Sequence, residues 1–224
     1  MHSHDDVIHG LRDVRECREP TRRRAQRRAT QDGAMGGDSD DSSFAEHCGE
    51  NRDRAYDALV EDYETPDEIL NAPEERLREL IAPAGLANSK ASYLKNAARH
   101  IVERRDGSTD WIRKEPSEDV HEELTSIKGI GHKTADVILL FAVDADYCPV
   151  DTHVDRVTGR LGVAPDMSPA KTREKLIEYR DECGVDLRKA HVALIAHGRA
   201  TCHARSPECG ECVVEDVCEK YGVN

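Results

Sequence analysis

ELTSIKGIGHKTADVILLFAVDADYCPVDTHVDRVTGRL, residues 123–161, is the stretch that decides the fold of this chain. Its centre, KGIGH at residues 128–132, separates two segments with helical periodicity. The second of these, Lys133–Ala142, is rich in alanine, valine, isoleucine and leucine. A glycine-containing turn at a helix start exposes backbone N–H groups, and such groups bind anions such as phosphate. The stretch therefore predicts two helices joined by an anion-binding hairpin at 127–132.

Two residues of this stretch are candidates for catalysis. Lys133 stands in the first turn of the second helix, where the positive helix end disfavours a second positive charge, so its amine is a candidate nucleophile. Asp151, in Val150-Asp151-Thr152-His153, places a carboxylate at the start of the next helix and is also a candidate N-cap. On the residues alone, a solvated lysine and a simple cap remain open as alternatives. The lysine directly after the hairpin and the aspartate eighteen positions further on favour the catalytic interpretation.

Four of the eight cysteines crowd into the C-terminal region with the spacing C-x6-C-x2-C-x5-C, at Cys202, Cys209, Cys212 and Cys218. Thiolates this close in sequence can reach one inorganic centre, and zinc and an iron–sulfur cluster use the same ligands, so spacing alone leaves both open. A disulfide framework is typical of secreted proteins and fits this clustering poorly. The other cysteines show no such pattern and are expected to be free thiols: Cys17, Cys48, Cys148 and Cys183.

Three segments resemble the helix-hairpin-helix DNA glycosylases of the endonuclease III type. They are IKGIGHKTADVIL followed by PVDTH, AGLANSKASYLKNAARHI, and HGRATCHARSPECGECVVEDVC, and the resemblance covers about Glu50–Tyr221. It implies that Lys133 attacks C1′ of the damaged nucleotide and that Asp151 is the catalytic carboxylate. It also implies a [4Fe–4S] cluster held by Cys202, Cys209, Cys212 and Cys218. The DNA contacts that it implies lie at Lys128, Gly129, Ile130, Gly131, His132 and Thr134.

The function implied by the resemblance is base-excision repair of DNA. The chain would be a bifunctional DNA N-glycosylase/AP lyase that removes oxidised pyrimidines and cuts the strand by β-elimination through a lysine Schiff base. Its partner would be double-stranded DNA with a damaged base or an abasic site, and we expect a monomer in the cytoplasm, associated with the nucleoid. Two alternatives stay open, namely a mismatch-directed glycosylase of the same superfamily and a non-catalytic DNA-binding relative. Sister groups that lack the lysine do not cut strands in this way.

The net charge of −13 is unusual for a protein that binds DNA, because phosphates repel an acidic surface. Only nine of the 32 basic residues are lysine, and acidic surfaces poor in lysine are typical of proteins from very salty cytoplasm, where salt screens this repulsion. The chain is therefore interpreted as halophilic. No apolar run approaches the ~20 residues of a membrane span, and no signal peptide is expected. Arg199, His203 and Arg205 flank the cluster cysteines and are candidates either for phosphate contacts or for solvated surface.

Helical patterns continue from Glu50 to the end of the chain, and no segment alternates with a period of two, so an all-α fold is expected. Residues 50–150 are assigned to a helical barrel domain with the hairpin, and residues 151–224 to a helical domain with the cluster loop at 202–218. Four further helix starts are predicted from capping residues. They are at Thr65-Pro66, at Asn88 or Ser89, at Ser117, and at Ser168-Pro169.

Met1–Gly49 is too poor in apolar residues to predict a folded unit, and an unstructured extension is expected. Codons for Phe44–Gly49, read one nucleotide later, can spell Ser-Gln-Asn-Thr-Ala, which is what relatives place before the segment that starts at Glu50. Met1–Gly49 is therefore hypothesised to be wholly or partly an out-of-frame translation, which the nucleotide sequence of codons 1–55 would decide. Loss of one apolar barrel helix would expose the Tyr56 face and the helix with Val137–Phe141.

Overall fold

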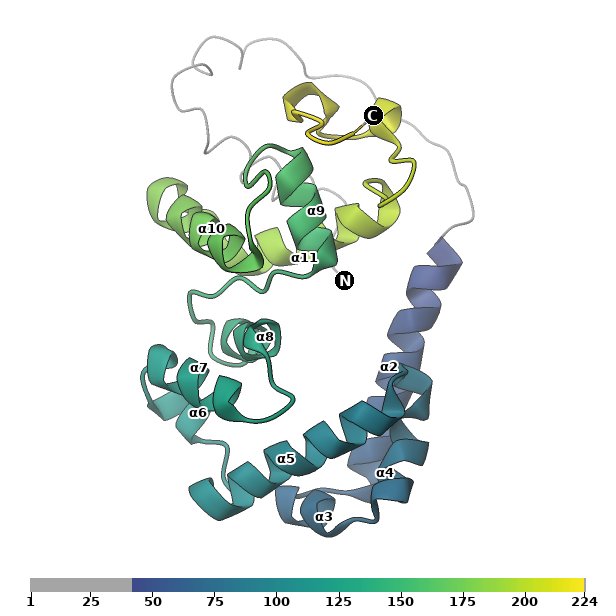
Figure 1. Cartoon of the computed structure of the whole chain (residues 1–224), viewed down its shortest axis with the longest axis vertical. Coiled ribbons are helices and arrows are strands. Elements are labelled where there is room, and N and C mark those ends of the chain that lie inside the picture. Colours follow the sequence, from purple (N-terminus) through teal and green to yellow (C-terminus); the bar gives the residue numbers. More distant parts are fainter. Residues whose placement is uncertain (1–41, 224) are drawn as a thin grey trace. The chain divides into compact units, whose positions relative to one another are not determined.

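The computed structural model describes residues 42–223 (Figure 1). Within this range every regular element is helical and no strand occurs, as the periodicity predicted. The described residues divide into two compact units, one ending at Ala145 and the other beginning at Asp146. We call them the hairpin unit and the cluster unit, and each is described by itself. The search for membrane-spanning segments found no described helix long and apolar enough for one.

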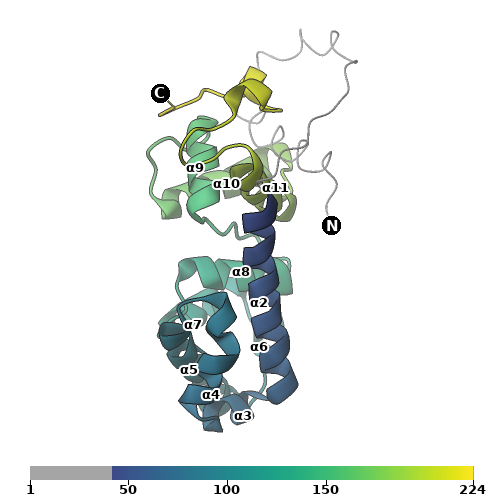
Figure 2. The same ribbon diagram turned by 90° about the vertical axis from the view of Figure 1, so that its right-hand side faces the viewer.

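The hairpin unit consists of α-helices joined by short turns. Helix α5 is the longest uninterrupted one after α2; it packs against α3 and α4, while α2 packs against α4 and η1 (Figure 2). The elements are α2 (Ser42–Asp62), α3 (Pro66–Asn71), α4 (Glu74–Ile81), η1 (Ala82–Ala84), α5 (Ala87–Arg105), α6 (Trp111–Lys114), α7 (Ser117–Ser126) and α8 (His132–Ala142).

Helix α2 begins at Ser42, inside the segment that was expected to be unstructured. That expectation is corrected for residues 42–49, because extending a helix that is already nucleated costs far less than starting one. Residues 1–41, with the rest of the proposed extension, lie outside the described residues. Tyr56, Val60 and Phe141 are 64%, 44% and 42% exposed, whereas Leu139 and Leu140 beside Phe141 are buried. The out-of-frame hypothesis stays a prediction.

The predicted helix starts are partly confirmed. Thr65 caps α3 with a capping box: its side chain accepts the N–H of Glu68, and the Glu68 carboxylate accepts the N–H of Thr65. Two other predicted caps are wrong, because the N-cap of α5 is Leu86 instead of Asn88 or Ser89 and the N-cap of α7 is Pro116 instead of Ser117. Helix α5 starts at Ala87 after Leu86 in left-handed conformation, and α7 starts at Ser117 after Pro116, with no side-chain cap at either.

The core of the hairpin unit joins α2 to α5. Ala72, Leu77, Ile81 and Ala91 are buried, and residues of α2, α3, α5 and the turn after α2 pack against them: Leu59, Tyr63, Ile69, Ala87 and Leu94. Each Å² of apolar surface buried here stabilises the fold by about 25 cal/mol, and the contacts fix the position of α5. Since Asn96 of α5 also donates a hydrogen bond to the carbonyl of Lys128 in the hairpin, the core helps to set the position of the candidate site.

A polar network links the C-terminal end of α5 to α7. The guanidinium of Arg105 donates to Glu123 of α7 through Nε (2.7 Å), also pairs with Glu115, and lies 4.5 Å from the centroid of the Trp111 ring. His100 lies 2.7 Å from Glu123. The hydrogen bonds from Arg105, with a smaller contribution from His100, lower the pKa of Glu123 to about 2. The network therefore ties α5 to the first helix of the hairpin motif.

Acid is expected to weaken the contacts of Arg105 and His100 with Glu123. The pKa of Glu123 is depressed in the folded protein, so its stabilising contribution is complete above an unfolded pKa of about 4.5 and is lost as pH falls towards about 2. The urea midpoint of unfolding should therefore fall between those values more steeply for the native protein than for Glu123→Gln. The matched control is Glu122→Gln, an exposed carboxylate on the same helix. Parallel pH profiles for the native protein and Glu123→Gln would contradict this prediction.

The cluster unit contains α9 (Thr152–Arg160), α10 (Pro169–Cys183), α11 (Leu187–Ala200) and the single turns η2 (Cys209–Glu211) and η3 (Glu215–Val217). Ser168 caps α10 as predicted, with its hydroxyl accepting the N–H of Lys171, and Gly184 ends that helix. The fully buried side chains come from all three α-helices and the cluster loop: Val154, Val157, Leu161, Leu176, Leu194 and Val214. Val214 anchors the cluster loop to the core.

The cysteines outside the cluster loop differ from one another. Cys183, at the end of α10, is disulfide-bonded, so the expectation that it is a free thiol is wrong. Its spacing carries no signal for a disulfide, because such a bond depends on which cysteines folding brings together. Cys148 is buried and outside any disulfide. The side chains of Cys17 and Cys48 lie outside the described residues.

Candidate functional site

The hairpin between α7 and α8 is a tight turn. The N–H of Ile130 donates to the carbonyl of Ile127 (2.9 Å), and Gly129 has φ +107°. A positive φ at the third position of such a turn favours glycine. Gly131 then serves as the N-cap of α8, and its carbonyl accepts the N–H groups of Thr134 and Ala135. The hairpin thus leads directly into the start of α8.

Three N–H groups of the hairpin are available to a ligand. Those of Gly129, Gly131 and His132 donate to no acceptor in the described part of the chain, whereas those of Ile130 and Thr134 are used within it. Gly129, Gly131, His132 and the Lys128 side chain are also exposed. Exposed N–H groups next to a helix N-terminus form an anion site.

Lys133 is exposed and is the second residue of α8, next to these N–H groups. Behind it, Asp136 is buried and lies 3.0 Å from Nε2 of His121, which joins α8 to α7. The ring of His121 stacks on that of His132, with centroids 5.4 Å apart. A buried carboxylate needs such a partner, so this contact holds the two helices of the motif together.

Asp151 lies in the cluster unit and is the N-cap of α9. Its Oδ1 accepts the N–H groups of His153 (2.8 Å) and Val154 (2.9 Å), which confirms the predicted cap. The preceding segment is held from α11, where Nδ1 of the buried His191 lies 3.0 Å from the carbonyl oxygen of Pro149. Both contacts restrict the direction in which the Asp151 carboxylate points. Lys133 and Asp151 belong to different units, so each is placed only within its own.

The four cysteines of the C-terminal loop line one pocket, together with residues of α9 and α11. The pocket lining includes Cys202, Cys209, Cys212, Cys218, Val157, Arg160, Leu161 and His197. Burial raises the pKa values of the Cys212 and Cys218 thiols, and the charges of the neighbouring cysteines raise them further. A cationic inorganic centre would offset this cost, because it stabilises the thiolates directly. The donor set therefore fits a metal centre.

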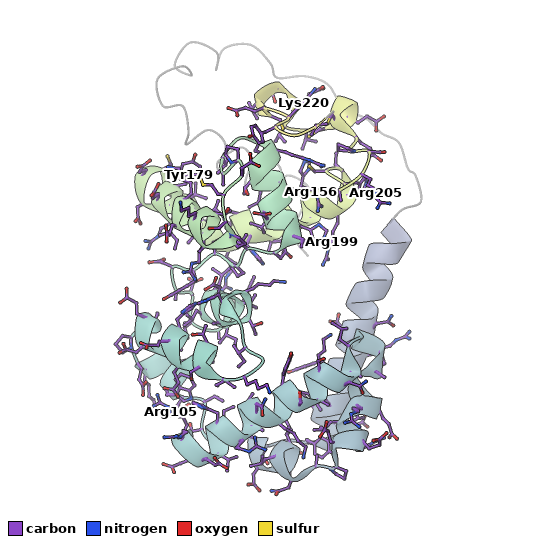
Figure 3. The ribbon with its side chains drawn as sticks, in the orientation of Figure 1. Arg105, Arg156, Tyr179, Arg199, Arg205 and Lys220 are labelled. Atoms are coloured by element: carbon purple, nitrogen blue, oxygen red, sulfur yellow. The ribbon has the colours of Figure 1, made fainter. Side chains whose placement is uncertain are left out.

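Two arginines of α9 hold the cluster loop by its backbone, and one of them, Arg156, is labelled in Figure 3. Arg156 donates to the carbonyls of Cys202 (2.9 Å) and Gly198 (2.7 Å). Arg160 donates to the carbonyl of His203 (2.6 Å) and lies 3.3 Å from the sulfur of Cys202. These bonds order the loop on which the cysteines stand.

His197 is buried beside the same pocket, with Nε2 3.6 Å from the sulfur of Cys212. Burial lowers its pKa to about 4, so the ring is neutral at pH 7. Among the described residues, no three His, Cys, Asp or Glu side chains converge on a point that would hold a single metal ion.

The comparisons with known proteins agree with this geometry. Residues 50–180 match the family described as HhH-GPD superfamily base excision DNA repair protein, and residues 202–218 match the iron-sulfur binding domain of endonuclease III. Endonuclease III of Sulfolobus acidocaldarius is 40% identical over 157 residues, which cover 70% of this chain and 68% of the relative. Endonuclease III of Escherichia coli (strain K12) is 36% identical over 160 residues, 69% of each chain.

Solved structures share the fold. A non-covalent endonuclease III–DNA complex superposes with a TM-score of 0.67 at 23% identity, covering 98% of this chain and 97% of the other. A thermostable thymine-DNA glycosylase superposes with a TM-score of 0.62 at 20% identity, covering 98% and 86%. Because the superfamily match spans more than half of the chain, the chain belongs to the HhH-GPD superfamily of base excision DNA repair proteins. Within it, the chain is a DNA glycosylase/AP lyase of the endonuclease III type, and its cofactor is a [4Fe–4S] cluster.

Several supporting residues were not predicted from the sequence. Arg156 and Arg160 recur at helical spacing, i and i+4, on a helix next to the cysteines, and that spacing could have indicated a shared target. His121 and Asp136 form no recognisable motif, and only the packing of α7 on α8 brings them together.

The cluster is expected to colour the protein. Anaerobically purified native chain should be brown, with the broad visible absorbance of an iron–sulfur protein and about four iron atoms per chain. Cys212→Ser should lower the iron content and the visible absorbance, whereas Ser206→Ala in the same loop should leave both unchanged. A colourless native protein with stoichiometric zinc would contradict the assignment.

Proposed function

We propose that this chain removes oxidised pyrimidines from double-stranded DNA and then cuts the strand at the resulting abasic site. The observation that carries the proposal is the placement of Lys133 directly after a hairpin whose N–H groups at Gly129, Gly131 and His132 are available to a phosphate. Such N–H groups position a nucleic acid without reading its sequence. They would therefore hold the backbone beside a primary amine.

The chemistry assigned to Lys133 is nucleophilic. Once the damaged nucleotide is flipped out of the duplex, the Lys133 amine attacks C1′ and displaces the base, and the ring-opened sugar forms a Schiff base with Nζ. β-Elimination then breaks the C–O bond on the 3′ side of the lesion, and hydrolysis of the Schiff base returns the amine. The chain's own contribution is to hold this amine at the exposed start of α8.

The carboxylate of Asp151 is assigned the role of supporting the sugar as it gains positive, oxocarbenium-like character during base loss. Its hydrogen bonds to the N–H groups of His153 and Val154 use Oδ1, which fixes the plane of the carboxylate. Negative charge placed where positive charge develops lowers the barrier most when the group is already oriented.

We assign the ligands of the cluster to Cys202, Cys209, Cys212 and Cys218. The cluster would supply structural order to the loop, and Arg156 and Arg160 would add to it from α9. Arg199 precedes the first cluster cysteine and Arg205 follows it, and both are exposed and without an ion pair in the described part of the chain (Figure 3). They are assigned phosphate contacts. In an otherwise acidic protein these local charges favour binding where the net charge opposes it.

We further propose that the protein acts as a monomer and that its net charge of −13 reflects a salty working environment. At 1 M salt the Debye length is about 3 Å, and the repulsion between exposed acidic groups and phosphates farther apart than this is largely screened. Activity should therefore persist at salt concentrations that strip less acidic proteins from DNA.

A panel of lesion-bearing duplexes tests the proposal. The native protein is expected to excise an oxidised pyrimidine such as thymine glycol and to nick an abasic site, with little excision from a G·T mismatch. Borohydride should trap a covalent adduct on the first two substrates. Preference for the mismatch would instead indicate a mismatch glycosylase. Binding without excision, nicking or trapping would indicate a non-catalytic DNA-binding protein.

A further inference from the structure

Helix α5 contacts the hairpin although it is not one of the two helices that the hairpin joins. The side-chain amide of Asn96 donates from Nδ2 to the carbonyl oxygen of Lys128 at 3.0 Å. Arg99 donates from Nη1 to Oδ1 of the same amide at 3.3 Å, which turns its NH₂ group towards the hairpin. These contacts connect residues 32 positions apart in the chain.

The peptide between Lys128 and Gly129 is the central peptide of the turn. Its C=O and N–H point in opposite directions, because the peptide bond is planar and trans, and no cis peptide occurs in the described residues. With the carbonyl held towards Asn96, the N–H of Gly129 must point away from α5. This is one of the three hairpin N–H groups without an acceptor in the described residues.

The turn has a competing conformation. Gly129 at φ +107° is typical of a type II turn, whereas a type I turn keeps the bond between Ile127 and Ile130 but rotates the central peptide by about 180°. That rotation would direct the N–H of Gly129 towards α5 and withdraw it from a ligand. The bond from Asn96 stabilises the type II form alone.

Tyr93 adds a second contact from α5. A Cβ added at Gly129 would lie 2.2 Å from Cγ and Cδ1 of the Tyr93 ring, so the ring packs directly against the glycine backbone. The ring is 39% exposed, and the rest of its surface is covered. Glycine is therefore required at 129 both by its positive φ and by this close approach.

We propose that Asn96 is a positioning residue for DNA binding, which holds the central peptide of the hairpin so that the N–H of Gly129 faces a backbone phosphate. The Tyr93 ring packs against the backbone of Gly129 in the same peptide, and Arg99 orients the side-chain amide of Asn96. This inference rests on the proposed function, because it names the group that sets the geometry of the same phosphate site. Asn96 itself touches no DNA and takes no part in the chemistry.

Asn96→Leu tests the proposal, since it keeps the approximate size of the side chain and removes the donor without changing charge. Binding to a duplex with a tetrahydrofuran abasic analogue should weaken about tenfold, the effect of losing one hydrogen bond to a charged group. The single-turnover nicking rate on a true abasic site at saturating protein should stay close to native. Ser92→Ala is the matched control, because Ser92 lies on the same helix and its hydroxyl donates to the carbonyl of Ser89 (2.8 Å) and to no other acceptor in the described residues.

A scan with single methylphosphonate linkages identifies the contact itself. In the native protein, replacing the contacted phosphate should weaken binding, because a neutral linkage accepts a weaker hydrogen bond. That penalty should disappear in Asn96→Leu and in Gly129→Ala, and remain in Ser92→Ala, with circular dichroism confirming the fold of each variant. A double-mutant comparison of this kind isolates one contact from general destabilisation.

The possible failures are distinguishable. If the penalty remains in Asn96→Leu but disappears in Gly129→Ala, the hairpin binds phosphate and the role of Asn96 is wrong. If the affinity loss caused by a methylphosphonate persists at every position when Gly129→Ala, shown to be folded, replaces the native protein, the hairpin does not contact a phosphate. In that case the hairpin contact in the proposed function is wrong as well. Native-like binding by Asn96→Leu would by itself overturn the positioning role.

Discussion

Lys133→Gln is expected to abolish the borohydride-trapped DNA adduct while leaving binding to an abasic analogue within a few-fold of the native value. The reason is chemical: only a primary amine forms a Schiff base with the sugar, and glutamine retains length and polarity but not nucleophilicity. The hairpin N–H groups of Gly129, Gly131 and His132 are unchanged by the substitution, so the phosphate site should persist. Trapping is read on a denaturing gel and binding by fluorescence anisotropy.

Lys171→Gln provides the control for lysine replacement. Lys171 is exposed in the first turn of α10, as Lys133 is in the first turn of α8, but it lies in the cluster unit away from any hairpin. Its replacement should leave trapping at the native level. Undiminished trapping in Lys133→Gln would show that a different amine is the nucleophile, and loss of trapping in both variants would point to a general effect of charge on binding.

Asp151→Asn is expected to slow base removal on the order of 10²–10³-fold, the range typical of losing one preorganised electrostatic contact to a charged transition state. Cleavage of a preformed abasic site should fall much less, because no base has to leave. Asparagine also serves as an N-cap, so its side-chain oxygen can keep the bonds to the N–H groups of His153 and Val154. The melting temperature should therefore change little, which separates a lost charge from a lost cap.

The control for this substitution is Asp186→Asn. Asp186 caps α11 in the same unit, with Oδ1 accepting the N–H of Lys189 at 2.9 Å, and it is exposed. Replacement there should leave both base removal and stability near native. Single-turnover rates on a thymine glycol duplex and on an abasic duplex provide the comparison. Equal losses on the two substrates in Asp151→Asn would contradict a role specific to base removal.

The two substitutions also separate the contributions of the two units. Lys133 stands on α8 of the hairpin unit and Asp151 on α9 of the cluster unit, at the first turn and the N-cap of their helices. Both groups therefore stand at the start of a helix, Lys133 in α8 and Asp151 in α9. In α8 this position places Lys133 next to the hairpin N–H groups, and in α9 the cap bonds restrict the direction of the Asp151 carboxylate before any substrate is bound.

The local order of this chain follows from its sequence. The all-helical fold, the hairpin at 127–132, the capping box at Thr65 and the N-cap at Asp151 each depend on residues within a few positions of one another. Their physical causes, namely helical periodicity, glycine at positive φ and side-chain capping, are short-range. The four-cysteine spacing is local too, so it predicted an inorganic centre, and the resemblance to endonuclease III favoured an iron–sulfur cluster over zinc.

The tertiary structure alone decided how these local elements are held. The contact of Asn96 with Lys128, the burial of Asp136 against His121, and the bonds from Arg156 and Arg160 to the cluster loop join residues 15 to 46 positions apart. Each depends on which helix faces become neighbours when apolar side chains leave water, and that choice leaves no periodic pattern around the polar residue itself.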